Sequence, residues 1–80
     1  MKWVEYSLEE REKVVKNLYY WQYSNKNSFS DMLFILFQKA DSENLLKLKK
    51  GFELEFLCLL EWYNADDNGN DLFREYGLMK

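Results

Sequence analysis

The sequence predicts an all-α fold, a compact bundle of four main helices in orthogonal packing with a short C-terminal helix. Apolar residues recur at intervals of three and four along most of the chain, which is the period of a helix face. Residues that favour helix N-termini precede several of these segments, and the chain contains no proline to interrupt them. A length of 80 residues suits one domain, which we expect to span residues 1–80.

The first helix is expected over residues 8–23. Ser7, followed three residues later by Glu10, forms a capping box, which marks the start of a helix. The spacing of the apolar residues predicts an inward face that is centred on Leu18 and includes Leu8.

The second helix, residues 29–40, is expected to be the most buried. Ser28 and Asp31 provide its cap. Its inward stripe should consist of the apolar residues that share one helix face. These are Phe29, Met32, Leu33, Leu36, Phe37 and Ala40.

Three shorter helices are expected over residues 43–50, 53–63 and 72–76. Gly51 should end the first of them in the left-handed conformation, as in a Schellman motif. Asp71 should cap the last helix, and Gly77 should end it. The expected inward face of the helix between them carries Phe56, Leu57, Leu60 and Tyr63.

Composition excludes several kinds of site. Cys58 is the only cysteine and there is no histidine, so neither an intrachain disulfide nor a Cys/His zinc site can form. Stability must come from a core rich in aromatic residues, in which we expect Cys58 to be reduced and buried. The net charge of −3 and the pI near 4.9 disfavour direct binding of nucleic acid. The longest apolar run, residues 32–37, is too short to span a bilayer, so we expect a cytoplasmic protein without a membrane partner.

A block in the middle of the chain resembles a segment of small helical accessory proteins of Gram-positive bacteriophages and mobile elements. It comprises Ala40-Asp41-Ser42-Glu43-Asn44-Leu45, Lys47-Leu48 and Lys50-Gly51-Phe52. The likeness covers about residues 29–63, but Glu53 stands where those proteins often have proline. The resemblance implies an accessory protein that acts inside a bacterial host, and it implies no catalytic residues.

No motif in the sequence brings together the groups that catalysis needs. The paired carboxylates Glu53 and Glu55, like Glu9 and Glu12, have no basic partner or metal motif beside them, so we expect solvated helix faces. A nucleophile motif and a phosphate-binding glycine loop are also missing. We therefore expect a protein that is not an enzyme and needs no cofactor.

Residues 64–75 allow one metal-binding alternative. The positions of an EF-hand that supply oxygen ligands, together with its glycine, are matched by Asn64, Asp66, Asn68, Gly69 and Glu75. Two features disagree with a calcium loop: its first position is normally Asp, and its eighth, normally apolar, is Asp71. An ordinary Asn/Asp/Gly loop is the leading interpretation, and a single calcium-binding module is the alternative.

Two groups of residues are candidates for binding a partner. One turn of the first helix is surrounded by aromatic residues, namely Tyr19, Tyr20, Trp21 and Tyr23. Either they pack on the core and the N-terminal segment, or they form an exposed patch of the kind found at interface hot spots. Asp66 and Asp67, in the more acidic half of the chain, would attract a basic groove on a partner.

The expected function is binding to a host or phage protein, with inhibition of a host defence or DNA-processing protein as its result. The alternative is a structural or morphogenetic subunit that associates with copies of itself, in which the spare aromatic residues bury each other.

Overall fold

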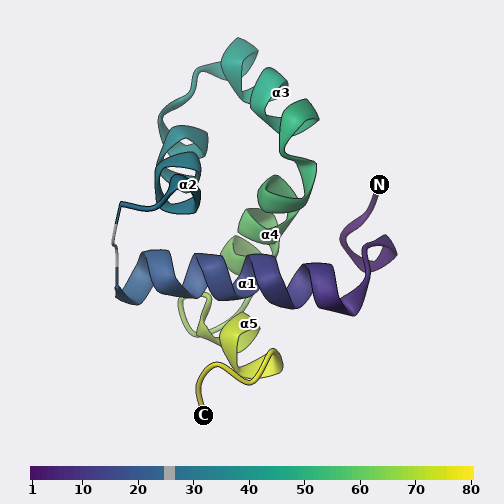
Figure 1. Ribbon diagram of the computed structural model, residues 1–80, viewed down its shortest axis with the longest axis vertical. Helices are drawn as coiled ribbons and strands as arrows, with labels where there is room; N and C mark the ends of the chain where they lie inside the picture. Colours follow the sequence, from purple (N-terminus) through teal and green to yellow (C-terminus); the bar gives the residue numbers. More distant parts are fainter. Residues whose placement is uncertain (25–26) are drawn as a thin grey trace.

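The computed structural model describes residues 1–24 and 27–80, and these ranges contain helices and no strand (Figure 1). A short 3-10 helix and five α-helices follow one another as η1 (Trp3–Glu5), α1 (Leu8–Tyr23), α2 (Phe29–Lys39), α3 (Ser42–Gly51), α4 (Glu53–Asn64) and α5 (Asn70–Glu75). The predicted all-α class is confirmed, and the expected helix boundaries agree with these to within two residues.

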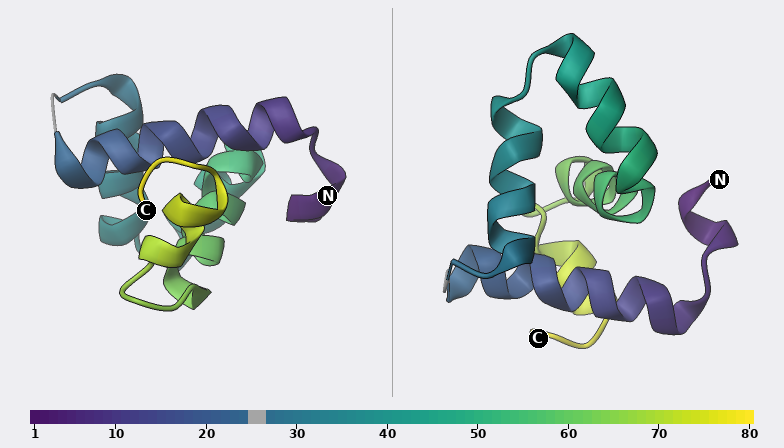
Figure 2. Two further views of the ribbon diagram at one scale, coloured as in Figure 1. Left: turned by 90° about the horizontal axis from the view of Figure 1, so that it is seen from below. Right: turned by 45° about the horizontal axis from the view of Figure 1, so that its top comes forward.

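Two helices hold the others together. α1 runs across the molecule and packs against α2, α4 and α5, while α4 packs against every other α-helix and against η1 (Figures 1 and 2). α2 packs mainly against α1 and α4, and α3 and α5 lie toward opposite ends of the long axis (Figure 1). α2 nevertheless has more buried residues than any other described helix, as the sequence predicted, although α1 and α4 contact more of the fold.

The N-termini of the first two α-helices are capped as predicted. The Ser7 hydroxyl accepts a hydrogen bond from the backbone N–H of Glu10, and the Glu10 carboxylate accepts one from the N–H of Ser7. Ser28 and Asp31 repeat this arrangement at α2. Each cap satisfies backbone donors that the first turn of a helix cannot pair internally.

The predicted helix ends were correct at Gly77 and wrong at Gly51. Gly51 is the last residue of α3, and its backbone is not left-handed. The left-handed glycine of a Schellman motif is Gly77, with φ of 75°; the N–H of Leu78 donates to the carbonyl of Phe73. Asp71 does not cap α5, because the left-handed Gly69 occupies the N-cap position and the helix begins directly after it.

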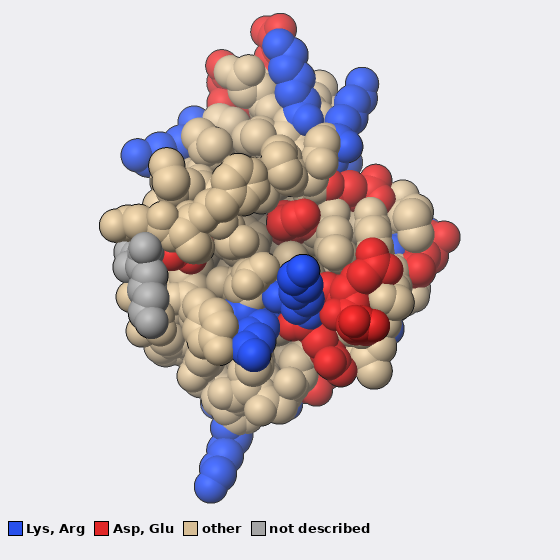
Figure 3. Space-filling model, viewed as in Figure 1, with Lys and Arg blue, Asp and Glu red and all other residues tan. Residues whose placement is uncertain are grey.

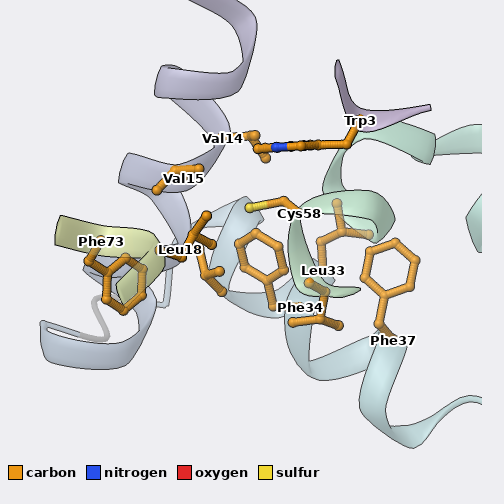
Figure 4. Close-up of a cluster of buried hydrophobic side chains, with 11 residues drawn as sticks. Trp3, Val14, Val15, Leu18, Leu33, Phe34, Phe37, Cys58 and Phe73 are labelled. Atoms are coloured by element: carbon orange, nitrogen blue, oxygen red, sulfur yellow. The ribbon is translucent and has the colours of Figure 1, made fainter. Parts of the chain in front are cut away.

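One hydrophobic core extends through the bundle (Figure 4). The ring of Phe34 points toward Leu18 of α1 and Cys58 of α4, and all three side chains are fully buried. The remaining core residues are Trp3, Val14, Val15, Leu33, Phe37, Leu59, Leu72 and Phe73. The expected burial of Cys58 is confirmed, and burial raises the pKa of its thiol.

The expected inward stripe of α2 is only partly correct. Leu33 and Phe37 are buried, but Phe29, Met32 and Leu36 are 69%, 59% and 51% exposed. Ala40 lies just beyond the helix, at its C-cap. The inward direction is instead set by Phe34, which lies between the two buried positions.

In α1 and α4, too, some residues that were predicted to face the core are exposed. Leu8 is 57% exposed, although the inward face centred on Leu18 is correct. In α4 the buried residues are Cys58 and Leu59, whereas Leu60 and Tyr63 of the expected inward face are 40% and 56% exposed. Where apolar residues follow one another without a break, their spacing does not identify the side that faces the core.

The N-terminal segment is fastened to α4 and to the C-terminal residues. Trp3 is buried, with its ring edge-on to that of Tyr76. The Tyr6 hydroxyl donates a hydrogen bond of 2.8 Å to Glu53, whose carboxylate also lies 3.0 Å from the amino group of Met1. The hydrogen bond to Glu53 raises the pKa of Tyr6 to about 12, and the amino group and the hydroxyl together lower the pKa of Glu53.

We predict a specific alkaline instability from Tyr6. The folded protein holds the phenolic proton more tightly than the unfolded chain does, so the stabilisation is complete below about pH 10 and is lost as the pH rises toward 12. Urea unfolding of the native protein and of Tyr6→Phe, compared from neutral pH upward, should show a difference in stability that shrinks above about pH 10. A difference that stays constant would contradict this assignment.

Replacing each of the three glycines with alanine should change the stability of the fold by a different amount. A Cβ at Gly69, where φ is 89°, would clash with Nε1 of Trp62, whereas Gly77 shares the left-handed backbone without a neighbour within 4 Å. Gly77→Ala should therefore cost about 1 kcal/mol and Gly69→Ala about 3 kcal/mol, because only the second adds a steric clash. Gly51→Ala, in a helical and open position, should be neutral or slightly stabilising. Equal losses at positions 69 and 77 in urea unfolding would contradict the contact with Trp62.

Candidate partner-binding site

The aromatic residues of α1 that the sequence singled out have different surroundings. Trp21 is half-buried and stacks on Phe34, with 5.5 Å between ring centroids. Tyr19 and Tyr23 both pack against the ring of Phe73 in α5. The prediction that several of these side chains pack on the fold is correct, but the N-terminal segment is covered by Tyr76 instead of by any of them.

Tyr23 remains 54% exposed, but Tyr20 is the member of this group that faces the surface beside α2. It is 47% exposed, and the ammonium group of Lys16 lies 5.8 Å from the centre of its ring. With Asn17 and Ser28 it lines a hollow of about 300 Å³ between the C-terminal half of α1 and the start of α2. Tyr20 therefore remains a candidate for partner binding, whereas Trp21 is mainly a packing residue.

The largest apolar side chains left open on α2 form a row. Phe29, Met32 and Leu36 follow one another at helical spacing, so they lie along one side of α2. Figure 3 shows that the surface over α2 carries mostly uncharged side chains, whereas acidic side chains gather beside the N-terminal half of α1. Contiguous apolar patches on a protein surface commonly mark interaction sites.

A second hollow adjoins this row. It has a volume of about 390 Å³ and lies between α1, α2 and the junction of α3 with α4; we call it the central hollow. Its walls include Glu10, Lys13, Val14, Asn17, Phe29, Leu33, Phe52, Leu54 and Glu55.

The central hollow, the exposed row of α2 and Tyr20 form one surface. Asn17 lines both hollows, so they are neighbours, and Phe29 belongs both to the row and to the wall of the central hollow. The ring of Phe29 also contacts that of Phe52, with 5.9 Å between centroids. We call this combination the α2 surface.

The predicted acidic residues lie elsewhere. Asp66 and Asp67 belong to the loop between α4 and α5 and do not line either hollow of the α2 surface. The Arg74 guanidinium donates hydrogen bonds to Asp67 and Asp71, which raise the pKa of Arg74. Asp67 is thus paired with Arg74 of α5, although Asp66 and Asp67 are both exposed.

Of the residues predicted as calcium ligands, Asp66 and Asn68 lie in this loop, whereas Asn64 ends α4 and Glu75 ends α5. In the described part of the chain, no three or more His, Cys, Asp or Glu side chains gather so that they could hold a metal ion. α5 begins directly after Gly69, whereas the loop of an EF-hand continues beyond its glycine. Asn64, Asp66 and Glu75 line one hollow and Asn68 does not, so the calcium alternative stays a prediction.

Glu55 differs from what the sequence led us to expect. It is half-buried instead of solvated, and its Oε2 atom is shut off from solvent without a hydrogen-bond partner among the described residues. Burial raises the pKa of the Glu55 carboxyl. A signal was present in the sequence: Glu55 precedes Cys58 and Leu59 by three and four residues, so it shares their helix face.

The exposed row of α2 was also missed as a candidate site, because its members were assigned to the core. The six consecutive apolar residues 32–37 could have indicated that some must face outward, since one helix face cannot include them all. The sequence did not show which ones.

Comparison of the chain with protein-family models, curated protein sequences and solved structures finds no match. In the part of the chain that the structure describes, no helix is both long and apolar enough to cross a membrane. The function of the α2 surface must therefore be inferred from its own residues.

We predict losses of stability of very different size for two phenylalanines of α2. Phe34→Ala, in a fully buried position, should lower the free energy of unfolding by about 3–5 kcal/mol. Phe29→Ala, at a side chain that is 69% exposed, should lower it by about 1 kcal/mol or less. Urea unfolding of both variants checks this, and a larger loss at Phe29 would restore the stripe predicted from the sequence.

Proposed function

We propose that this protein is a non-enzymatic accessory protein of a bacteriophage or mobile element that binds a host or phage protein through the α2 surface. The observation that carries this proposal is the exposed row of Phe29, Met32 and Leu36. The resemblance of residues 29–63 to phage accessory proteins supports the biological setting.

The exposed row has the chemistry of an interface anchor. Burying one large apolar side chain contributes about 1.5–3 kcal/mol, so three adjacent side chains can supply much of the energy of a specific complex. They project from one helix, so little conformational entropy of the backbone is lost when a partner covers them. A folded helix that presents an apolar row is a common element of protein recognition.

The charge of the protein favours a basic partner. The chain has a net charge of −3, and Glu10 and Glu55 both line the central hollow beside the row. Opposite charge at an interface accelerates association and selects among partners. Enzymes that process DNA have basic grooves, so inhibition of a host defence or DNA-processing protein is the activity that we propose.

A second candidate function uses the same row. Two copies of the chain could bury Phe29, Met32 and Leu36 against each other, since a largely uncharged helix face can be complementary to itself. This would make the protein a structural or morphogenetic subunit. Sedimentation at high protein concentration separates the two functions: a monomer excludes self-association, and a dimer lost on replacement of the row supports it.

The proposal predicts that binding depends on the row and not on exposed apolar residues in general. The triple variant Phe29→Ser, Met32→Ser, Leu36→Ser should stay folded, yet it should lose a stoichiometric partner that the tagged native protein retains from lysates of infected or uninfected bacteria. The matched control is Val4→Ser, Leu8→Ser, which replaces side chains that are 71% and 57% exposed on other elements.

The control variant should retain the partner. A partner that is kept by the triple variant and lost from the control would contradict the assignment to the α2 surface. Circular dichroism of both variants establishes that any loss of binding is not a loss of fold.

A further inference from the structure

Glu55 is an acidic side chain at a position where the fold favours an apolar one. It shares a helix face with Cys58 and Leu59, which are 0% and 4% exposed. Its Oε2 atom has neither water contact nor a hydrogen-bond partner in the described part of the chain. An unpaired carboxylate oxygen away from solvent costs stability, so an uncharged residue would serve the fold better here.

We propose that the central hollow receives an arginine side chain of the partner protein and that Glu55 is the counter-charge of its guanidinium group. This inference rests on the proposed function for the existence of a partner protein. It adds the chemical identity of the group that the partner inserts.

The walls of the central hollow suit the two parts of an arginine side chain. Val14, Leu33 and Leu54 provide apolar contacts for its methylene groups. Phe29 and Phe52 place aromatic rings beside the hollow, and a guanidinium group stacks on such rings more readily than the compact, strongly hydrated ammonium group of lysine. The volume of about 390 Å³ lies within the usual range of binding sites, about 300–1,000 Å³.

A guanidinium group can also donate the hydrogen bond that Oε2 of Glu55 lacks. Its five N–H donors form a planar fork that can pair with both oxygens of a carboxylate. The last torsion of a glutamate side chain has a broad energy minimum, so Glu55 can turn its carboxylate toward the hollow at low cost.

Two other charged residues line the central hollow. Glu10 is engaged at the start of α1, where its carboxylate accepts hydrogen bonds from the N–H and the hydroxyl of Ser7. Lys13 is exposed, and the structure shows no ion pair within 4.0 Å between it and Glu55. Glu55 is therefore the carboxylate that is left for an incoming cation.

The test uses N-butylguanidinium as a probe and neutral N-butylurea, which has nearly the same shape, as its control. Titration of the ¹⁵N-labelled protein, followed by NMR, should show saturable shifts of the amides around the central hollow with the first compound only. Glu55→Gln should weaken binding by about tenfold or more, because a charged hydrogen-bond partner is lost. Glu12→Gln removes an exposed charge of the same sign that does not line the central hollow, so it should change the affinity by less than about threefold.

Three results would overturn the inference. They are equal binding of N-butylurea, equal losses in Glu55→Gln and Glu12→Gln, and no saturable binding of N-butylguanidinium to the native protein. The failure of the proposed function is a separate result: the triple variant of the row would then retain the partner, whatever the probe does. Partner capture by the α2 surface without binding of the probe would remove the arginine inference alone.

A stability measurement provides the second arm. Glu55→Met replaces the carboxylate with an apolar side chain of similar length, so it should raise the urea midpoint of unfolding while it abolishes binding of N-butylguanidinium. A lower midpoint would mean that Glu55 stabilises the fold itself and would contradict its assignment to a partner.

Discussion

The ring of Phe34 is the point at which three helices of this chain meet. It extends from α2, stacks on Trp21 of α1 and lies toward Cys58 of α4, and no part of it is exposed. A chain of 80 residues with one cysteine has no intrachain disulfide to support it, so its stability depends on such contacts. Once Phe34 points inward, the helix period determines the direction of every other side chain on α2.

This constraint is the origin of the α2 surface. With Phe34 inward, Phe29, Met32 and Leu36 turn toward solvent, although they are as apolar as the core. The same packing brings Glu55 of α4 to the wall of the central hollow, beside Phe29. The apolar row and the half-buried carboxylate are neighbours because α2 and α4 share a core. Exposed apolar surface and an unpaired carboxylate oxygen both raise the free energy of the free protein, and a partner that covers the row and pairs with the carboxylate would remove both costs.

The elements of the fold were predictable because their signals are local. The capping boxes at Ser7 and Ser28 and the left-handed Gly77 lie within a few residues of the ends that they define. The side of α2 and of α4 that faces the core was not predictable. Their apolar runs allow several inward faces, and the choice among these depends on residues far away in sequence. For the same reason, the candidate site was found only in part: Tyr20 was named, whereas Phe29 was assigned to the core and Glu55 to a solvated face.

Because Cys58 is buried, the reactivity of its thiol depends on transient opening of the core. Only the thiolate reacts readily with alkylating reagents, and burial disfavours that form while the core is closed. Because this is the only thiol, the rate of alkylation would measure how often the contact between α4 and Phe34 breaks, without any introduced label. A partner that holds α2 against the bundle would slow the alkylation of Cys58. The reactivity of this buried thiol would therefore report binding at the α2 surface, which the thiol does not contact.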